Sequence, residues 1–189
     1  MAVPQKVLDS VYGSKPGDWK QHENGGGWVY KTAIVEKSVY LHPSSLVYGN
    51  ARVYGDAWVY GNARVYGDAW VYGDAQVFGD ARVSGDAWVS GNARVSGNAQ
   101  VSGNARVSGN DWEVSPLQIQ GTKHYLNVAA NGVLQIGHIQ KPLTWWKKFH
   151  ARAGKEKGYT PEQIAEYREY VDLAEKWLTR LGRLEVTKK

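Results

Sequence analysis

An aliphatic residue recurs at every sixth position through the middle of the chain. The series begins at Val29, includes Leu41 and ends at Val107, with valine at all the remaining positions. In most of these repeats a small residue stands two positions earlier, as Ala51 stands before Val53. Two inward side chains separated by one outward side chain give the period of a strand with one buried face. We therefore predict a short β-strand in each six-residue repeat.

Glycine and an aspartate or asparagine stand between most consecutive strands, as Gly55 and Asp56 do. Glycine adopts positive φ without a Cβ clash, and aspartate and asparagine tolerate it better than most residues. The pair is therefore typical of a sharp corner. Because a strand and a corner in only six residues leave no room for an ordinary hairpin, the repeats indicate a β-solenoid.

This pattern resembles the hexapeptide-repeat superfamily of the bacterial transferase hexapeptide type. The resemblance covers residues 29–112 without an insertion. It implies that three repeats form one triangular turn of 18 residues, and that the turns stack as a left-handed parallel β-helix. We thus expect an all-β solenoid with a small α+β unit at its C-terminal end.

The segments on either side of the repeats have different patterns. Residues 1–28 are expected to cap the solenoid, because an end turn exposes unpaired backbone groups. Asp111 stands where an inward alanine is expected, so the repeat is predicted to decay there. Residues 113–189 are then expected to form a separate unit.

That C-terminal unit is predicted to begin with a small sheet. The stretches LQIQ, HYLNV and VLQIG are typical of strands. Asn131 and Gly132 predict a hairpin turn between the second and third of them. Two helices should complete the unit.

The helix predictions rest on capping residues. Thr144 is expected to cap a short helix that ends at Gly154. Thr160, followed by proline and three residues later by glutamine, is a capping-box pattern for a longer amphipathic helix. Gly182 is the expected C-terminal stop of that helix.

The net charge of +5 is concentrated near the C-terminus. Residues 115–189 carry thirteen Lys and Arg against seven Asp and Glu, whereas residues 29–114 carry seven against eight. A basic unit attracts an anion, a nucleic acid or an acidic protein, but a solvated helix surface has the same composition. Nothing resembles a sequence-specific DNA reader.

The start of the shorter predicted helix is a possible anion site. It combines aromatic and cationic side chains, namely Trp145, Trp146, Lys147 and Lys148. The alternative is that the tryptophans belong to the core and the lysines are solvated.

The composition also bears on the cellular location of the protein. The chain has no cysteine, no secretory leader pattern and no apolar stretch long enough for a membrane helix. We therefore expect a cytoplasmic protein that does not interact with membranes.

Outward positions 18 residues apart should form columns on the faces of the solenoid. Aromatic residues fill the early turns and serines replace them later. These columns could form an assembly interface, stack a base and hold its phosphate, or only stabilise neighbouring turns. The candidate ligand-binding or assembly residues are Arg52, Tyr54, Trp58, Tyr60, Trp70, Tyr72, Trp88, Ser90, Arg94 and Arg106.

Catalysis is disfavoured by what the repeats lack. The resemblance includes acyltransferases, which imply a histidine at a subunit cleft and a loop extruded between turns, but His42 is the only histidine in an uninterrupted frame. Related zinc enzymes need three such histidines. Asp68 and Asp86 stand one turn apart, as do Asp56 and Asp74, and we interpret them as solvated corners. We expect no catalytic residues, no metal and no cofactor.

The expected function is therefore binding. The superfamily resemblance implies a homo-oligomer, most simply a trimer, with a small anionic ligand such as a nucleotide in the clefts between subunits. The C-terminal unit resembles that of phage-encoded hexapeptide-repeat proteins, which implies a viral sponge for a nucleotide immune signal in the host cytoplasm. The alternatives are an acyltransferase-like enzyme and a purely structural assembly or interaction scaffold.

Overall fold

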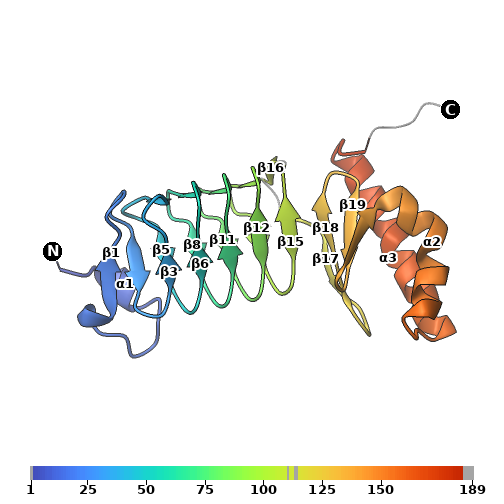
Figure 1. Cartoon of the computed structure of the whole chain (residues 1–189), viewed down its shortest axis with the longest axis horizontal. Helices are drawn as coiled ribbons and strands as arrows, with labels where there is room; N and C mark the ends of the chain where they lie inside the picture. Colours follow the sequence, from blue (N-terminus) through green and yellow to red (C-terminus); the bar gives the residue numbers. More distant parts are fainter. Residues whose placement is uncertain (1, 110, 113–114, 185–189) are drawn as a thin grey trace. The chain divides into compact units, whose positions relative to one another are not determined.

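The computed structural model describes residues 2–109, 111–112 and 115–184. The chain divides into two compact units, Met1–Ser115 and Pro116–Lys189. The first is a β-solenoid of about four turns, and the second is an antiparallel sheet followed by two helices (Figure 1). The predicted fold class is confirmed at this level, and the left-handed winding stays a prediction from the resemblance.

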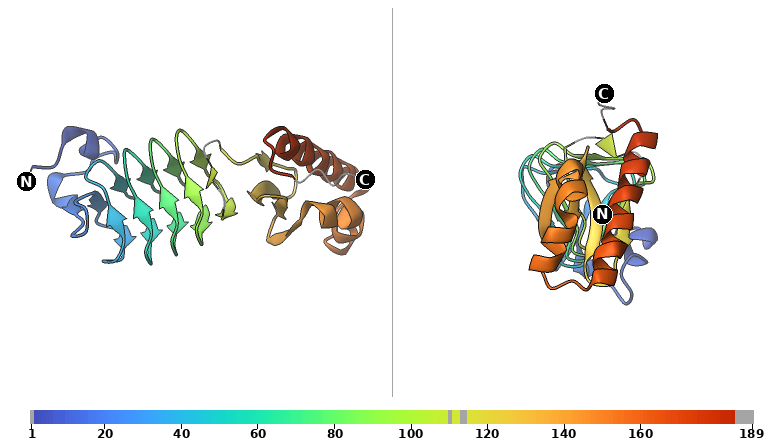
Figure 2. Two further views of the ribbon diagram at one scale, coloured as in Figure 1. Left: turned by 90° about the horizontal axis from the view of Figure 1, so that it is seen from above. Right: turned by 90° about the vertical axis from the view of Figure 1, so that its right-hand side faces the viewer.

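The solenoid has three sheets, each built from every third strand of the repeat. Figure 2 shows the strands of successive turns side by side. Sheet I contains β1 (Trp19–Gln21), β2 (Trp28–Tyr30), β5 (Leu46–Val47), β8 (Arg64–Val65), β11 (Arg82–Val83) and β14 (Gln100–Val101). Sheet II contains β3 (Ile34–Val35), β6 (Arg52–Val53), β9 (Trp70–Val71), β12 (Trp88–Ser90) and β15 (Arg106–Ser108). Sheet III contains β4 (Tyr40–Leu41), β7 (Trp58–Val59), β10 (Gln76–Val77), β13 (Arg94–Val95) and β16 (Asp111–Trp112).

The strands from β2 to β15 pair in parallel with a register of 18 residues. Val47 lies beside Val29 on one side and Val65 on the other. The repeat valines from Val47 to Val101 and the alanines from Ala51 to Ala105 are fully buried, which gives the solenoid a continuous apolar core. The predicted three-repeat turn and the inward positions are therefore confirmed.

Glycine is required at the corners because adjacent turns approach closely there. Gly67 has a φ of +73°, and a Cβ at this position would lie 2.9 Å from the backbone nitrogen of Gly85. The backbone N–H of Asp68 donates to the carbonyl of Gly85 at 3.0 Å. The same bond joins Asn50 to Gly67, Asn62 to Gly79 and Asp80 to Gly97, so two of the three rows of corners are linked from turn to turn.

Two acidic corner residues accept hydrogen bonds from the corner of the preceding turn. The amide of Asn50 donates to Oδ1 of Asp68 at 3.0 Å, and Asn62 donates to Asp80 at 3.2 Å. Within the described ranges, no group of three or more His, Cys, Asp or Glu residues is placed to hold a metal ion. Asp68 and Asp80 therefore help to join successive turns through side-chain hydrogen bonds.

The N-terminal segment packs at the first turn. It contains α1 (Gln5–Leu8) and η1 (Pro16–Asp18), and β1 then pairs antiparallel with β2, so that sheet I gains an edge strand of opposite direction. Val7, Trp19, Trp28 and Leu46 form its apolar core.

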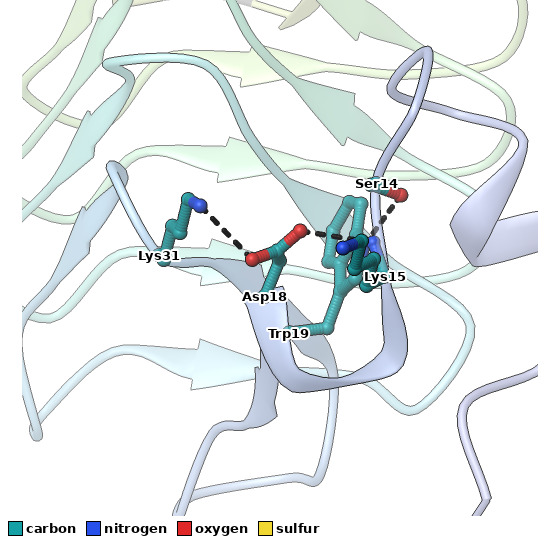
Figure 3. A network of polar contacts seen from close by, with 5 residues as sticks. All are labelled: Ser14, Lys15, Asp18, Trp19 and Lys31. Carbon is teal, nitrogen blue, oxygen red and sulfur yellow. Dashed lines mark hydrogen bonds and ion pairs between the residues drawn. The ribbon is translucent and has the colours of Figure 1, made fainter.

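Asp18 fixes this segment to the solenoid (Figure 3). Its carboxylate accepts from the backbone N–H of Lys15 and from the Lys31 ammonium, both at 2.9 Å. The Trp19 indole donates to the Ser14 hydroxyl at 3.2 Å in the same network. The Lys15 N–H bond and the Lys31 charge hold the pKa of Asp18 below its ordinary value.

The last turn is closed by a tryptophan that the repeat pattern does not indicate. In β16, Asp111 pairs with the outward residue Arg94, and Trp112 pairs with the inward residue Val95. The register there is one residue shorter than in the other turns. Trp112 is fully buried at an inward position. The repeat therefore breaks at Asp111, as predicted, and Trp112 takes an inward position one residue earlier than the repeat spacing gives.

The second unit has a four-stranded sheet in the order β17 (Gln118–Gln120), β18 (Tyr125–Ala130), β19 (Val133–Ile136) and β20 (Ile139–Pro142). Asn131 and Gly132 connect β18 to β19, which confirms the predicted hairpin turn. The fourth strand was not predicted. Both helices, α2 (Leu143–Glu156) and α3 (Pro161–Arg180), lie on one side of this sheet (Figure 1).

One helix cap was predicted correctly and one was not. Thr160 forms the expected capping box, with Gln163 bonding back to its backbone N–H, and Gly182 follows α3 with a φ of +65°. The helix α2 begins earlier than expected, after Pro142, so that Thr144 lies inside its first turn, and it ends at Glu156 rather than at Gly154. None of the described helices has the length and hydropathy of a membrane span.

Candidate functional site

The outward side chains of sheet II form a column in which aromatic rings stack between two arginines. Trp70 and Trp88 stack at 5.4 Å between ring centroids. The Arg52 guanidinium lies 4.8 Å from the centre of Trp70, and the Arg106 guanidinium lies 4.6 Å from that of Trp88. Two arginines therefore flank the two stacked rings, a favourable arrangement because each ring face attracts a cation.

The other predicted residues of sheet II support this column from the side. Tyr54 lies 6.1 Å from Trp70 in a tilted contact, and Tyr72 meets Trp88 edge to face at 6.2 Å. Ser90 is half-buried and pairs in register with Ser108. The structure thus brings all the predicted residues of this face together, and their aromatic rings mainly contact one another.

Sheet III differs because its aromatic column is interrupted. Tyr40 packs on Trp58 at 5.0 Å, but the next residue in that column is Gln76. Trp58 keeps 50% of its surface exposed. A surface hollow lies at this point, lined by Tyr40, His42, Trp58, Tyr60 and Gln76.

A second column of outward side chains on sheet III, which contains Tyr60 and Phe78, lies next to this hollow. Tyr60 stacks on Phe78 at 4.8 Å with an angle of 2° between the rings. The Arg94 guanidinium lies 5.5 Å from the centre of the Phe78 ring, one turn beyond Gln76. A cation therefore lies near the aromatic platform.

His42 supplies a polar group whose proton is fixed by its surroundings. The backbone N–H of Ser44 donates to Nδ1 of His42 at 3.2 Å. In the neutral ring, the proton is therefore on Nε2, because one nitrogen accepts while the other carries hydrogen. His42 can thus donate a hydrogen bond through Nε2.

Gln76 supplies a second polar group at the hollow. Its side-chain amide makes no hydrogen bond within the part of the chain that the structure describes. Tyr40, His42 and Gln76 were not among the predicted site residues. The signal that finds them is the 18-residue register, which places Tyr40 and Gln76 on either side of Trp58.

The four residues of the predicted anion site at the start of α2 all have partners inside the C-terminal unit. Trp146 is buried and donates its indole N–H to the carbonyl of Leu134 at 3.1 Å. Lys147 pairs with Glu175 at 2.7 Å. Trp145 meets Trp146 edge to face at 5.1 Å and contacts Phe149 at 5.4 Å, and the Lys148 ammonium lies 5.2 Å from the centre of the Phe149 ring. The alternative interpretation of core tryptophan and surface lysine fits Trp146 and Lys147.

The structure also brings together residues that the sequence leaves scattered. His124, His138 and His150 line one cavity in the C-terminal unit, together with Tyr159 and Tyr167. Burial raises the pKa of the Tyr159 phenol above its ordinary value. Burial and nearby Lys123 and His138 lower the pKa of His124. No sequence motif marks this group, because its members come from four separate segments.

Comparison with known families finds one match. The family described as YdcK Beta solenoid repeat matches residues 47–61, 57–73, 75–91, 87–101 and 99–113. These residues are therefore similar to the YdcK beta-solenoid repeat. The YdcK matches include Trp58, Tyr60 and Gln76, whereas Tyr40 and His42 lie outside them. No curated protein and no solved structure matches the chain. The resemblance to the hexapeptide-repeat superfamily is thus supported at the level of a β-solenoid repeat.

Proposed function

We propose that this is a non-enzymatic binding protein that holds a small anionic ligand with a planar ring, such as a nucleotide, on sheet III of the solenoid. The observation that carries the proposal is the half-exposed Trp58 ring in the hollow lined by His42, Tyr60 and Gln76. A base stacked on such a ring is stabilised by about 1–3 kcal/mol.

The hollow combines this ring with groups that suit a nucleotide. Nε2 of His42 donates a hydrogen bond, and the Gln76 amide can donate to and accept from a base edge. The Arg94 guanidinium, one turn away, suits a phosphate because charge-assisted hydrogen bonds to phosphate are strong. No Asp or Glu of the described ranges lines the hollow.

Sheet II offers a ligand less room for stacking. Trp70 already contacts Arg52 and Trp88, and Trp88 contacts Arg106 on its other side. A ligand would have to displace one of these partners. Sheet III needs no such displacement at Trp58, because Gln76 rather than an aromatic ring follows it along the column.

Binding is favoured over acyl transfer by the state of His42. A transferase of the resembled type implies a histidine that removes a proton from the acceptor. Here the Ser44 N–H occupies Nδ1, so the neutral ring presents an N–H at Nε2. In this arrangement Nε2 donates a hydrogen bond to a ligand rather than accepting one.

The proposal includes association of several copies, most simply a trimer. Trp58 and Ile34 expose 50% and 47% of their surfaces on neighbouring sheets. Solvent-exposed apolar side chains of this size are stabilised when a second copy covers them. In a trimer with parallel axes, the ligand would lie in the cleft between subunits. A viral sponge for a host nucleotide signal is the setting that the C-terminal resemblance suggests for such a protein.

Trp58→Ala tests the ligand site, and Trp88→Ala is its matched control. Binding of the four ribonucleoside monophosphates is measured by titration calorimetry. We expect at least one of the four nucleotides to bind the unchanged protein. Trp58→Ala should weaken the affinity for that nucleotide about tenfold or more. Trp88→Ala should change the nucleotide affinity about twofold or less, because the ring that it removes already has partners on both faces. Absence of binding by all four, or equal binding by the Trp58 variant, would contradict the proposal.

A purely structural scaffold is the second candidate. It is favoured by the ring pairs within the chain, such as Tyr48 stacked on Tyr66 at 4.9 Å and Tyr60 on Phe78 at 4.8 Å. Aromatic pairs of this kind stabilise neighbouring strands without any ligand. If this is the function, both tryptophan variants lose stability and no nucleotide binds.

A further inference from the structure

The C-terminal unit contains a cavity that the proposed function does not use. Its walls come from the segment before β18, from β19 and β20, and from both helices. The cavity measures about 30 Å³ and is partly open to solvent. This is room for one or two water molecules, or for the head group of a small ligand.

The cavity is apolar apart from a few basic or neutral ring groups. Ile136, Ile139 and Ile164 supply much of its apolar surface. His138 and Lys157 are exposed residues of the lining and add polar groups to it. Among the residues that the structure describes, no Asp or Glu lines it. A ligand with an apolar body and a negative charge is therefore compatible with every part of the wall.

Two of the polar groups in the lining already have partners. The Tyr159 hydroxyl is bonded to Nδ1 of His124 at 2.5 Å, and these two rings stack with centroids 5.6 Å apart. The Tyr167 hydroxyl donates to the carbonyl of His124 and accepts from its backbone N–H. Neither hydroxyl can bind a ligand without losing a bond inside the protein.

His150 is different because one of its ring nitrogens has no partner. Its Nδ1 atom is buried and makes no hydrogen bond within the residues that the structure describes. Buried polar atoms are almost always bonded to protein or to an ordered molecule. Since His150 lines the cavity, a bound molecule there can supply the missing bond.

The walls around this atom are held in place. The Lys123 ammonium donates to the carbonyls of Lys157 and Gly158, which ties the segment before β18 to the end of α2. A Cβ on Gly154 would lie 2.8 Å from Cγ1 of Ile164, so α2 and α3 are in close contact there. These contacts hold the segment before β18, the end of α2 and α3 together around the cavity.

We infer that this cavity binds a small hydrophobic carboxylic acid, with its carboxylate accepting a hydrogen bond from Nδ1 of His150. The closed end takes the carboxylate, and the apolar part of the acid packs against the isoleucines. His138 and Lys157 add favourable charge near the entrance. This site lies entirely in the C-terminal unit and is independent of the nucleotide site proposed for sheet III.

The test uses the full chain with benzoate as the anionic probe and benzyl alcohol as its uncharged counterpart. His150→Leu removes the ring nitrogen, whereas His150→Asn places an amide nitrogen close to the Nδ1 position. Trp58→Ala is the control in the other unit. Binding is followed by chemical-shift changes of the histidine ring protons, and far-UV circular dichroism shows that each variant is folded.

We expect benzoate to bind in the millimolar range and to shift the ring signals of His150, with benzyl alcohol binding about tenfold more weakly or not at all. His150→Leu should weaken benzoate about tenfold or more, and His150→Asn should restore most of the affinity. Trp58→Ala should have no effect on benzoate, which separates this test from that of the nucleotide site. Failure of benzoate to bind, equal binding of the two probes, or unchanged binding by a folded His150→Leu variant would overturn the inference.

Discussion

The stacking of the corner glycines leads to a quantitative prediction about Gly67. Replacing it with alanine has two costs. The residue keeps a φ of +73°, and its new Cβ lies 2.9 Å from the nitrogen and 3.3 Å from the oxygen of Gly85 in the next turn. Both of those atoms belong to the backbone, so the contact cannot be relieved by a side-chain rotation. The turns must separate locally or the corner must change its conformation.

Gly91 is a matched control for this substitution. It has the same kind of corner conformation, with a φ of +60°, but nothing lies within 4 Å of a Cβ built on it. Alanine at positive φ costs about 1–2 kcal/mol, and the reduced freedom of the unfolded chain returns about 0.4–1 kcal/mol. Gly91→Ala should therefore destabilise the protein by about 1 kcal/mol. Gly67→Ala should add about 1–3 kcal/mol for the close contact.

The assay is equilibrium unfolding in urea, followed by far-UV circular dichroism for the unchanged protein and both variants. The midpoint should fall clearly for Gly67→Ala and only slightly for Gly91→Ala. If the two variants lose the same stability to within about 0.5 kcal/mol, the difference in packing has no energetic effect, and the account of the corners is wrong.

Two other substitutions test the ends of the solenoid. Trp112→Ala should cost about 3–5 kcal/mol because it removes a fully buried ring from the last turn, and urea unfolding should show this loss against a smaller one for the half-exposed Trp58→Ala. An equal loss for both would mean that Trp112 does not close the core. Asp18→Asn should lower the melting temperature at pH 7, because the folded-state pKa of Asp18 lies below its ordinary value of about 3.9. The stabilising effect of the carboxylate is complete above that ordinary value and is lost as the pH falls through the folded-state pKa. The melting temperatures of the two proteins should therefore converge in acid, and a difference that persists there would exclude the Lys15 and Lys31 contacts as its cause.

The solenoid could be predicted from the sequence because its signal is local and repeated. Nearly every repeat has an inward valine and most corners have a glycine, so each repeat predicts the same local structure. The spacing of 18 residues then predicts which outward residues form a column. The end of the solenoid could not be predicted in the same way. Trp112 follows Val107 after five residues instead of six, so a rule based on strict spacing assigns the inward position to the wrong residue.

The C-terminal unit shows a different limit. The Asn131-Gly132 turn and the Thr160 cap are local signals, and both were predicted correctly. The strand β20 has the sequence IQKP, whose lysine and proline are uncommon in strands, and it was missed. At Trp145 and Trp146, neighbouring residues of a helix point in different directions, and only tertiary packing decides which one is buried.

The candidate sites were predicted only in part for the same reason. The register shows that Tyr40 and Gln76 flank Trp58, but it does not show that the aromatic column leaves a hollow there. The histidine cavity depends on how a sheet and two helices pack, and His124, His138 and His150 have no common spacing. Tertiary contacts of this kind leave no periodic trace in the sequence.

Native mass spectrometry of the protein taken directly from cells tests the proposed binding function most directly. It reports the number of subunits and any small molecule that remains bound. The account predicts a mass three times that of the 21.0-kDa chain, with additional mass from a nucleotide-sized ligand that is lost in the Trp58→Ala variant. A single chain without added mass would contradict it.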